Sequence, residues 1–189
     1  LATSSVLAAD KYWVAVDGIG YWAESNWSTT AGGSGTTFDD GSTAYIYLPV
    51  NNVDLNGQSP TVWSFRPSNS YSPSNLCVLN IYNTSKEDST LTIQTTGFRV
   101  DDFKNMVVTF GGSESVGKVI VYNNKANNDS RCPLDLKHNS HLVFDANSEY
   151  TEIDGKLGNY IGNADGTSDS VTVSHTEAHS IAVPSAPFS

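Results

Sequence analysis

The sequence is short of charge, and above all of positive charge. Charged residues make up 16% of its 189 residues, against about 25% in an average soluble domain. Ten lysines and arginines are set against 20 aspartates and glutamates, which gives a net charge of -10. Nucleic acids and anionic lipids are bound by clustered Lys and Arg, so the balance argues against both as partners. It is compatible with calcium, with carbohydrate or simply with solubility.

Long apolar runs and cysteines are also scarce. No apolar run is long enough to predict a membrane span. The only two cysteines are Cys77 and Cys132. In a chain rich in Ser, Thr and Asn, such a pair predicts one disulfide in an oxidising compartment, and two free, buried thiols are the alternative.

The first residues indicate export. Val6, Ala8 and Ala9 precede Asp10 in a pattern similar to the end of a secretory signal peptide and its cleavage site. We therefore expect a secreted or cell-surface protein. Residues 1–10 are a signal remnant or an N-terminal extension that pairs with another subunit, residues 11–183 form one β domain, and residues 184–189 are a proline-containing tail. Three sequons, at Asn26, Asn83 and Asn128, permit N-glycosylation.

What the chain has in quantity is the pattern of short β-strands. The expected strands are apolar or alternating runs of four to eight residues bounded by Gly, Asn, Asp, Ser or Pro. They cover residues 11–16, 43–50, 60–65, 76–82, 90–94, 106–110, 118–122, 140–144, 151–154, 169–173 and 180–183. No window has the i, i+3, i+4, i+7 spacing of a long helix.

The spacing of these strands allows two all-β architectures. A right-handed parallel β-solenoid is favoured, because residues 76–155 repeat a short apolar strand followed by Asn, Gly or Asp and another strand. A β-sandwich or jelly roll is the alternative, since no strict repeat period is visible.

Several segments resemble the opening of bacterial surface proteins of the autotransporter-passenger type. They are Tyr12-Trp-Val, residues 21–28 with their Asn-Trp-Ser, the glycines of 32–35 and residues 53–57, together with later rung-like stretches at 91–94 and 103–112. In that family an Asn-Trp-Ser segment with nearby glycines precedes a right-handed β-helix, so the resemblance implies a β-helix with a role at the cell surface.

The best candidate for a metal site is a loop of alternating oxygen side chains. Asn163, Asp165, Thr167 and Asp169 surround a glycine, an arrangement that suits a calcium ion. The alternative is an Asx turn between two strands. Residues 145–149 form a weaker loop of the same kind.

Two further sets of polar residues can be interpreted either as functional sites or as ordinary surface residues. His175, Glu177 and His179 would share one face of a strand and could hold a metal, although an exposed polar face explains them as well. The adjacent pair Asp39 and Asp40 is interpreted as turn or solvent residues, because neighbouring carboxylates on a strand point in opposite directions.

The aromatic residues divide between core and ligand binding. Most tryptophans of a β domain belong to the core. Tyr45 and Tyr47 lie on the same face of an expected strand, and if Ile46 is buried between them they form an outer patch for a ligand such as a glycan.

No nucleophile motif or phosphate-binding loop is present. The sequence therefore predicts an extracellular structural or adhesive protein, a subunit of a surface fibre or layer that pairs strands with copies of itself. A carbohydrate-binding module is the alternative, and a glycan-cleaving β-solenoid enzyme is a third.

Overall fold

The computed structural model of the chain describes residues 9–15, 18–46, 50–67, 77–94, 98–99, 106–124, 134–135, 141–152, 161–162 and 172–175. Within these ranges the chain forms β-strands joined by turns and contains no α-helix, which confirms the all-β prediction. No helix that could cross a membrane is found in them.

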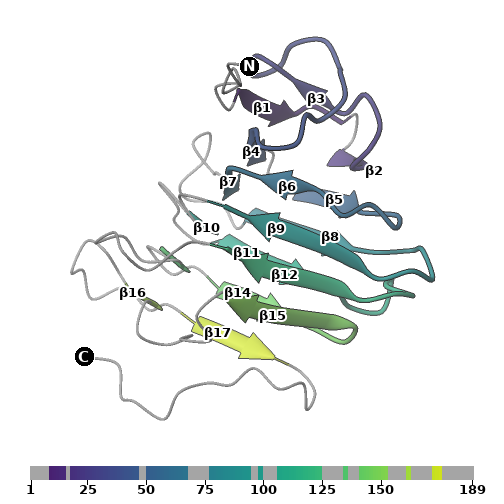
Figure 1. Cartoon of the computed structure of the whole chain (residues 1–189), viewed down its shortest axis with the longest axis vertical. Helices are drawn as coiled ribbons and strands as arrows, with labels where there is room; N and C mark the ends of the chain where they lie inside the picture. The colour runs from purple at the N-terminus through teal and green to yellow at the C-terminus, as the bar shows by residue number, and fades with distance from the viewer. Residues whose placement is uncertain are drawn as a thin grey trace, which may run out of the picture.

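The strands lie in three sheets, which Figure 1 shows as stacked arrows. Sheet A holds, in spatial order, β16 (Ile161–Gly162), β13 (Leu134–Asp135), β10 (Phe98–Arg99), β7 (Ser64–Pro67), β4 (Thr43–Ile46), β1 (Asp10–Trp13) and β3 (Trp27–Ser28). Sheet B holds β17 (Thr172–His175), β14 (His141–Phe144), β11 (Met106–Phe110), β8 (Cys77–Tyr82), β5 (Val50–Asp54) and β2 (Ile19–Tyr21). Sheet C holds β15 (Ser148–Glu152), β12 (Val119–Asn123), β9 (Ser89–Ile93) and β6 (Thr61–Val62).

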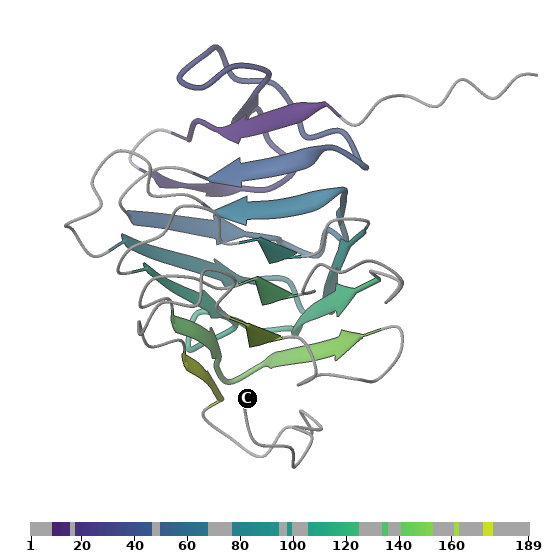
Figure 2. The ribbon, with the colours of Figure 1, turned by 90° about the vertical axis from the view of Figure 1, so that its left-hand side faces the viewer.

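Neighbouring strands are parallel and in register, except for the antiparallel pair β1 and β3. The chain passes from sheet A to B to C and then returns to A one coil further along, as in β7–β8–β9 followed by β10–β11–β12. Parallel neighbours need a long crossover connection, and here the crossover is the remainder of the coil. Figure 2 shows the resulting columns of strands. The fold is a parallel β-solenoid, which confirms the favoured architecture over the sandwich.

Inward-facing side chains of successive coils stack in the core. Ile81, Phe110 and Phe144 occupy one register position in three consecutive strands of sheet B, and each is at most 3% exposed. The rings of Phe110 and Phe144 stack with centroids 5.6 Å apart and an angle of 13°. Burying each such side chain stabilises the fold by about 1.5–3 kcal/mol. Because alternate residues of a strand point to opposite faces, the residues between them face outward.

Some strand boundaries differ from the prediction. Residues 60–65 were expected to form one strand, but β6 and β7 are separated by the exposed Trp63, where the chain turns from sheet C to sheet A. Val62 and Ser64 are both buried, each in its own sheet. Residues 43–50 likewise include the end of β4 at Ile46 and the start of β5 at Val50. The prediction did not include the short strands β2, β3, β10, β13 and β16, because two or three residues carry no periodicity.

Asn83 joins three coils at the corner between sheets B and C. It is fully buried, and its Oδ1 accepts from the backbone N–H groups of Gly57 at 2.9 Å and Ser85 at 3.2 Å. Its Nδ2 donates to the carbonyls of Glu87 at 2.7 Å and Lys118 at 3.2 Å. The side chain therefore satisfies backbone groups that would otherwise be orphaned inside the corner.

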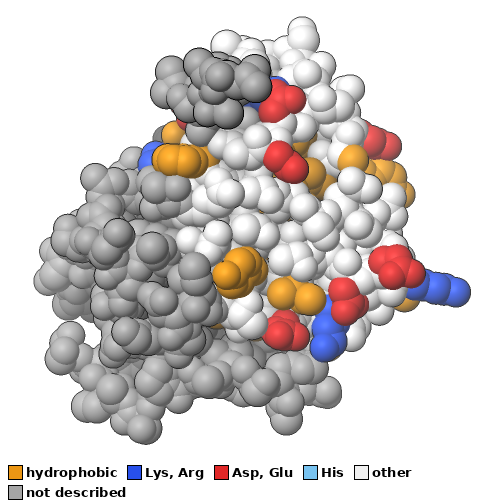
Figure 3. Space-filling model, viewed as in Figure 1, with side chains coloured by type: hydrophobic (Ala, Val, Ile, Leu, Met, Phe, Trp, Pro, Cys, Tyr) orange, Lys and Arg blue, Asp and Glu red, His pale blue; other side chains and the backbone are white. Residues whose placement is uncertain are grey.

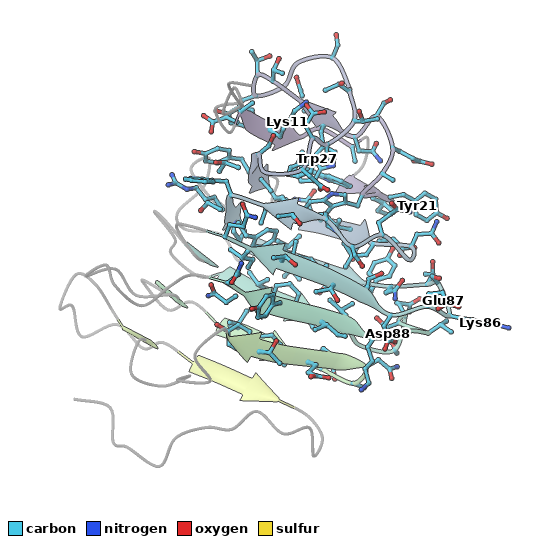
Figure 4. The ribbon with its side chains drawn as sticks, viewed as in Figure 1. Lys11, Tyr21, Trp27, Lys86, Glu87 and Asp88 are labelled. Carbon is cyan, nitrogen blue, oxygen red and sulfur yellow. The ribbon has the colours of Figure 1, made fainter. Side chains whose placement is uncertain are left out.

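Residues 18–41, here called the cap, cover the N-terminal end of the solenoid. The rings of Trp13, Trp22 and Trp27 are at most 3% exposed, which confirms the core interpretation for these three. Trp27 contacts the other two with ring centroids 5.1 Å and 4.6 Å away. Trp27 also forms an antiparallel bridge to Thr36, outside the named strands. Figure 4 shows Lys11 and Trp27 at this end of the molecule.

Candidate functional site

A row of polar side chains lies on the outer face of sheet B. Asn52, Asn80 and Thr109 occupy one register position in β5, β8 and β11. Leu79 and Ile81, on either side of Asn80, are buried, so the alternation of the strand places the row outside. The Asn80 side-chain nitrogen donates to Asn52 Oδ1 at 2.9 Å. This bond fixes both amides and does not use the Asn52 nitrogen or the Asn80 oxygen.

Tyr82 stands beside this row, at the end of β8. Its ring is half-buried, and in register it faces Asp54 of β5, which in turn faces Tyr21 of β2. Burial raises the pKa of the Tyr82 hydroxyl, and the negative charges of Asp54 and Glu114 and the neighbouring Tyr21 raise it further. The hydroxyl is therefore protonated at neutral pH and can donate a hydrogen bond. Tyr21 is 44% exposed and points outward at the edge of the molecule in Figure 4.

Two glycines shape the corner that follows β11. Gly111 and Gly112 have φ angles of 81° and 98°, a region that favours glycine. A Cβ on Gly111 would lie 2.3 Å from the carbonyl oxygen of Ala146 in the next coil. The Gly112 N–H donates to that same oxygen at 2.7 Å. The backbone therefore passes close to the next coil at this point, before the chain continues into Ser113 and Glu114.

These features enclose a groove of about 220 Å³, here called the sheet B groove. Its lining residues are Asn52, Asn80, Tyr82, Thr109, Gly111, Gly112, Ser113, Glu114 and Asp145. None of these described lining residues is Lys, Arg or His. Enclosed pockets for drug-sized ligands have volumes of about 300–1,000 Å³, so the groove suits one unit of a longer ligand.

The chemistry of the groove is that of hydrogen bonding to a neutral polar ligand. Glu114 and Asp145 supply carboxylate acceptors, and Tyr82 supplies a hydroxyl. Asp145 Oδ1 accepts from the backbone N–H of Ala146 at 2.7 Å, which orients that carboxylate. The described residues contain no group of three His, Cys, Asp or Glu that could hold a metal ion.

The predicted tyrosine patch on β4 is only partly described. Ile46 is 1% exposed, so Tyr45 faces outward as expected, whereas Tyr47 lies outside the described residues. The Tyr45 ring stacks on Tyr12 with centroids 5.0 Å apart, and the Arg66 guanidinium lies 5.6 Å from the ring centre. Because β1 and β7 flank β4 on opposite sides, both faces of the Tyr45 ring are covered. Burial, with smaller effects of Asp10 and Tyr45, raises the pKa of Tyr12.

The sequon asparagines that the structure describes are engaged in the fold. The Asn83 nitrogen that a glycan would occupy is buried and hydrogen-bonded, so the folded chain leaves no access to it. A glycan on Asn83 would displace these hydrogen bonds, so the described fold has no room for one, and glycosylation at this residue stays a prediction. The Asn26 nitrogen donates to the carbonyl of Tyr21 at 3.0 Å and packs against Gly20. Asn128 lies outside the described residues.

The other candidates depend on parts of the chain that the structure does not describe. Cys77 begins β8, but Cys132 lies outside the described residues, so the disulfide stays a prediction. The calcium loop of Asn163, Asp165, Thr167 and Asp169 also lies outside them, as do Glu177 and His179. Both metal hypotheses therefore stay predictions.

No family model, curated protein or solved structure matches the chain. The resemblance to autotransporter passengers stays a prediction beyond the shared solenoid architecture.

The described surface in view in Figure 3 carries little charge. On the face shown in Figure 3, most of the described surface over the strands is neither apolar nor charged. Sequence reasoning missed the groove residues as a group, although it noted Asp145 in a turn. The signal that could have found them is the strand register, which places Asn52 and Asn80 side by side although they are 28 positions apart.

Proposed function

We propose that the chain is an extracellular adhesive protein that binds glycans through the sheet B groove. The observation that carries this is the composition of the groove: two side-chain amides, hydroxyl groups and two carboxylates, with no cationic side chain. Sugar hydroxyls both donate and accept hydrogen bonds, so they match this mixture of donors and acceptors.

The scaffold supports a binding role. Asn52, Asn80 and Thr109 project from paired strands, and the hydrogen bond between the two amides holds them before a ligand arrives. Sites built on strands are more precise than sites on loops, and preorganised groups lose less entropy on binding. The remaining lining residue on a strand is Tyr82, and the other five, which are Gly111, Gly112, Ser113, Glu114 and Asp145, lie in the turns that follow β11 and β14.

Charge supports neutral or cationic glycans over acidic ones. Glu114 and Asp145 would repel a uronate or a sulfated sugar, and the chain as a whole carries a net charge of -10. Electrostatic complementarity of this kind selects partners more than it adds affinity. Location outside the cell is part of the proposal and is supported by the low share of charged residues.

Assembly by strand pairing is the part of the sequence-based hypothesis that the described residues support least. At the N-terminal end of the solenoid the edge strand of sheet B is β2, which has three residues, and the edge strand of sheet A is β3, which has two. The Asn26 side chain donates a hydrogen bond to the carbonyl of Tyr21 on β2, and Trp27 of β3 forms an antiparallel bridge to Thr36. Short or covered edges oppose the addition of a strand. Self-association through other parts of the chain stays a proposal.

A glycan array of the purified chain tests the proposal, with Glu114→Gln as the site variant and Glu87→Gln as its control. Both glutamates are exposed in turns between sheets B and C, one coil apart, but only Glu114 lines the groove. We expect binding to neutral or amino-containing glycans, weakened about fivefold or more by Glu114→Gln, which corresponds to ~1 kcal/mol. An array without hits for the folded chain, or equal loss in both variants, would contradict it.

Glycan cleavage is the second candidate, because Glu114 and Asp145 line the same groove. Glycoside hydrolysis commonly uses two carboxylates on either side of the scissile bond. Incubation with the glycan found on the array separates the two functions: new reducing ends that disappear in Glu114→Gln and Asp145→Asn indicate cleavage, and an unchanged glycan indicates binding alone.

A further inference from the structure

A second cavity lies between the cap and the first coil, apart from the sheet B groove. Its volume is about 430 Å³, within the range of about 300–1,000 Å³ that is usual for small-molecule sites. Its lining residues are Trp22, Ala23, Phe38, Asp39, Asp40, Gln58, Ser59 and Pro60. This cavity, here called the cap pocket, shares no residue with the groove.

The aromatic wall of the cap pocket is fixed by packing. The Trp22 ring contacts Phe38 edge-on, with centroids 5.0 Å apart, and lies 4.6 Å from the centroid of Trp27. The Trp27 indole N–H donates to the carbonyl of Trp22 at 2.9 Å. Phe38 is only half-buried, so part of its ring borders the pocket.

Asp39 and Asp40, the acidic residues of the cap pocket, are each held in place by a contact with the fold. Lys11 is 3% exposed, and its Nζ lies 2.8 Å from Asp39 Oδ2 and donates to the carbonyl of Thr37 at 3.1 Å. Asp40 Oδ1 accepts from the backbone N–H of Thr61 at 3.1 Å. The pocket is thereby formed before any ligand binds, which lowers the entropic cost of binding.

Several polar groups of the cap pocket are unused. The Trp22 Nε1 is buried and has no acceptor among the described residues, an uncommon state for an indole N–H. The Gln58 side chain is exposed and forms no hydrogen bond within the described part of the chain. Lys11 balances the charge of Asp39, so Asp40 leaves the lining with a net negative charge.

We propose that the cap pocket binds a single sugar unit that carries a protonated amine. The apolar face of the sugar ring packs against Phe38, Gln58 bonds its hydroxyl groups, and the ammonium group lies beside Asp40. An aromatic face with amide and carboxylate groups around it suits a sugar, and the negative lining favours a cation. The inference depends on residues that the groove does not use, so it does not require glycan binding there.

Tryptophan fluorescence tests this site separately from the groove. Three of the four tryptophans lie in or next to the cap, and the fourth, Trp63, is 38% exposed. The Trp63→Phe variant therefore reports on the cap alone. It is titrated at about pH 6 with glucosamine, glucose and glucuronate, since carboxylates are ionised and amines protonated there.

We expect glucosamine to change the emission and to bind about two- to fivefold more tightly than glucose, the range of an exposed ion pair, with glucuronate weakest. Adding Asp40→Asn, which keeps the acceptor for Thr61, should abolish the preference for the amine. Adding Gln58→Ala should weaken all three sugars. Glu114→Gln, in the groove, should leave the response unchanged.

An unchanged emission with all three sugars would overturn the proposal. So would equal affinity for glucosamine and glucose, or a preference that survives Asp40→Asn. Loss of the response in Glu114→Gln would show that the groove, not the cap pocket, is the site. An array without hits beside a normal fluorescence response would reject the groove and retain the cap pocket.

Discussion

The side-chain amide of Asn80 donates to the side-chain oxygen of Asn52 at 2.9 Å, from the same position of the next coil. This contact exists only because sheet B is parallel and in register. It links the fold to the proposed function, since the two amides line the sheet B groove. Each coil therefore places one residue at the same outward-facing register position. The residues at that position determine what the surface can bind.

Asn83→Ala should lower the free energy of unfolding by about 2–4 kcal/mol, because it leaves several buried backbone groups without partners. The side chain is fully buried and bonds to Gly57, Ser85, Glu87 and Lys118. Urea unfolding measures the loss. Gln94→Ala is the control, since Gln94 is half-buried at the end of β9. Equal stability of the two variants would show that the corner does not depend on Asn83.

Asp39→Ala should destabilise the chain by about 1–2 kcal/mol, because it leaves the buried ammonium of Lys11 with only a carbonyl partner. The figure is moderate because the Asp39 side chain is 70% exposed. Adding Lys11→Met to Asp39→Ala should recover part of the lost stability. Thermal unfolding of the unchanged chain, the two single variants and the double variant gives the double-mutant cycle. The pair Lys118 and Glu149, 3.7 Å apart and both about half-exposed, is the control and should contribute less than about 0.5 kcal/mol. Additive effects of Lys11 and Asp39 would contradict this coupling.

Gly111→Ala should destabilise the chain more than Gly41→Ala. Both glycines have positive φ angles, 81° and 83°, so both variants carry backbone strain. Only at Gly111 does the added Cβ meet another atom, 2.3 Å away in the next coil, while at Gly41 nothing lies within 4 Å. We expect a difference of about 1–3 kcal/mol in the free energy of unfolding. Equal losses of stability in the two variants would mean that backbone strain alone, and not the close approach of the next coil, explains why position 111 needs glycine.

Much of the fold follows from the sequence, whereas the groove does not. The sequence predicted β8, β9, β11, β12 and β14 to within a residue or two, because each is a short apolar or alternating run bounded by turn residues. The groove forms because residues of successive coils are in register. The coils differ in length, so the sequence shows no fixed spacing between these residues. In-register partners are 21 residues apart at Tyr45 and Arg66, and 28 apart at Asn52 and Asn80.

The surroundings of Tyr45 and Asn83 could not be predicted from the sequence for a related reason. The strand pattern placed Tyr45 outside correctly, but it could not show that neighbouring coils would supply Tyr12 and Arg66 to cover both faces of the ring. The Asn83 sequon was visible as three letters, whereas its burial depends on backbone groups of the coils before and after it.

Tyr82 should make stability depend on pH in the alkaline range. Its pKa is raised in the folded chain above the ordinary value of about 10 for tyrosine. Its contribution to stability is therefore complete below about pH 10 and is lost as the pH rises through the folded pKa, because the unfolded chain releases the proton first. Because the pKa of Tyr12 is raised as well, phenolate absorbance should show one late-titrating tyrosine fewer in Tyr82→Phe than in Tyr21→Phe. A Tyr82→Phe variant with the same late titration would contradict this assignment.

The most direct test of the glycan-binding account is a nuclear magnetic resonance titration of the ¹⁵N-labelled chain with the best glycan from the array. We predict that the largest shifts fall on the side-chain amide signals of Asn52 and Asn80 and on the backbone amides of Gly111, Gly112 and Glu114, which come from three different coil segments but line one groove. Shifts gathered around Tyr12, Tyr45 and Arg66 of sheet A, or no shifts at saturating glycan, would contradict the assignment of the sheet B groove as the binding site.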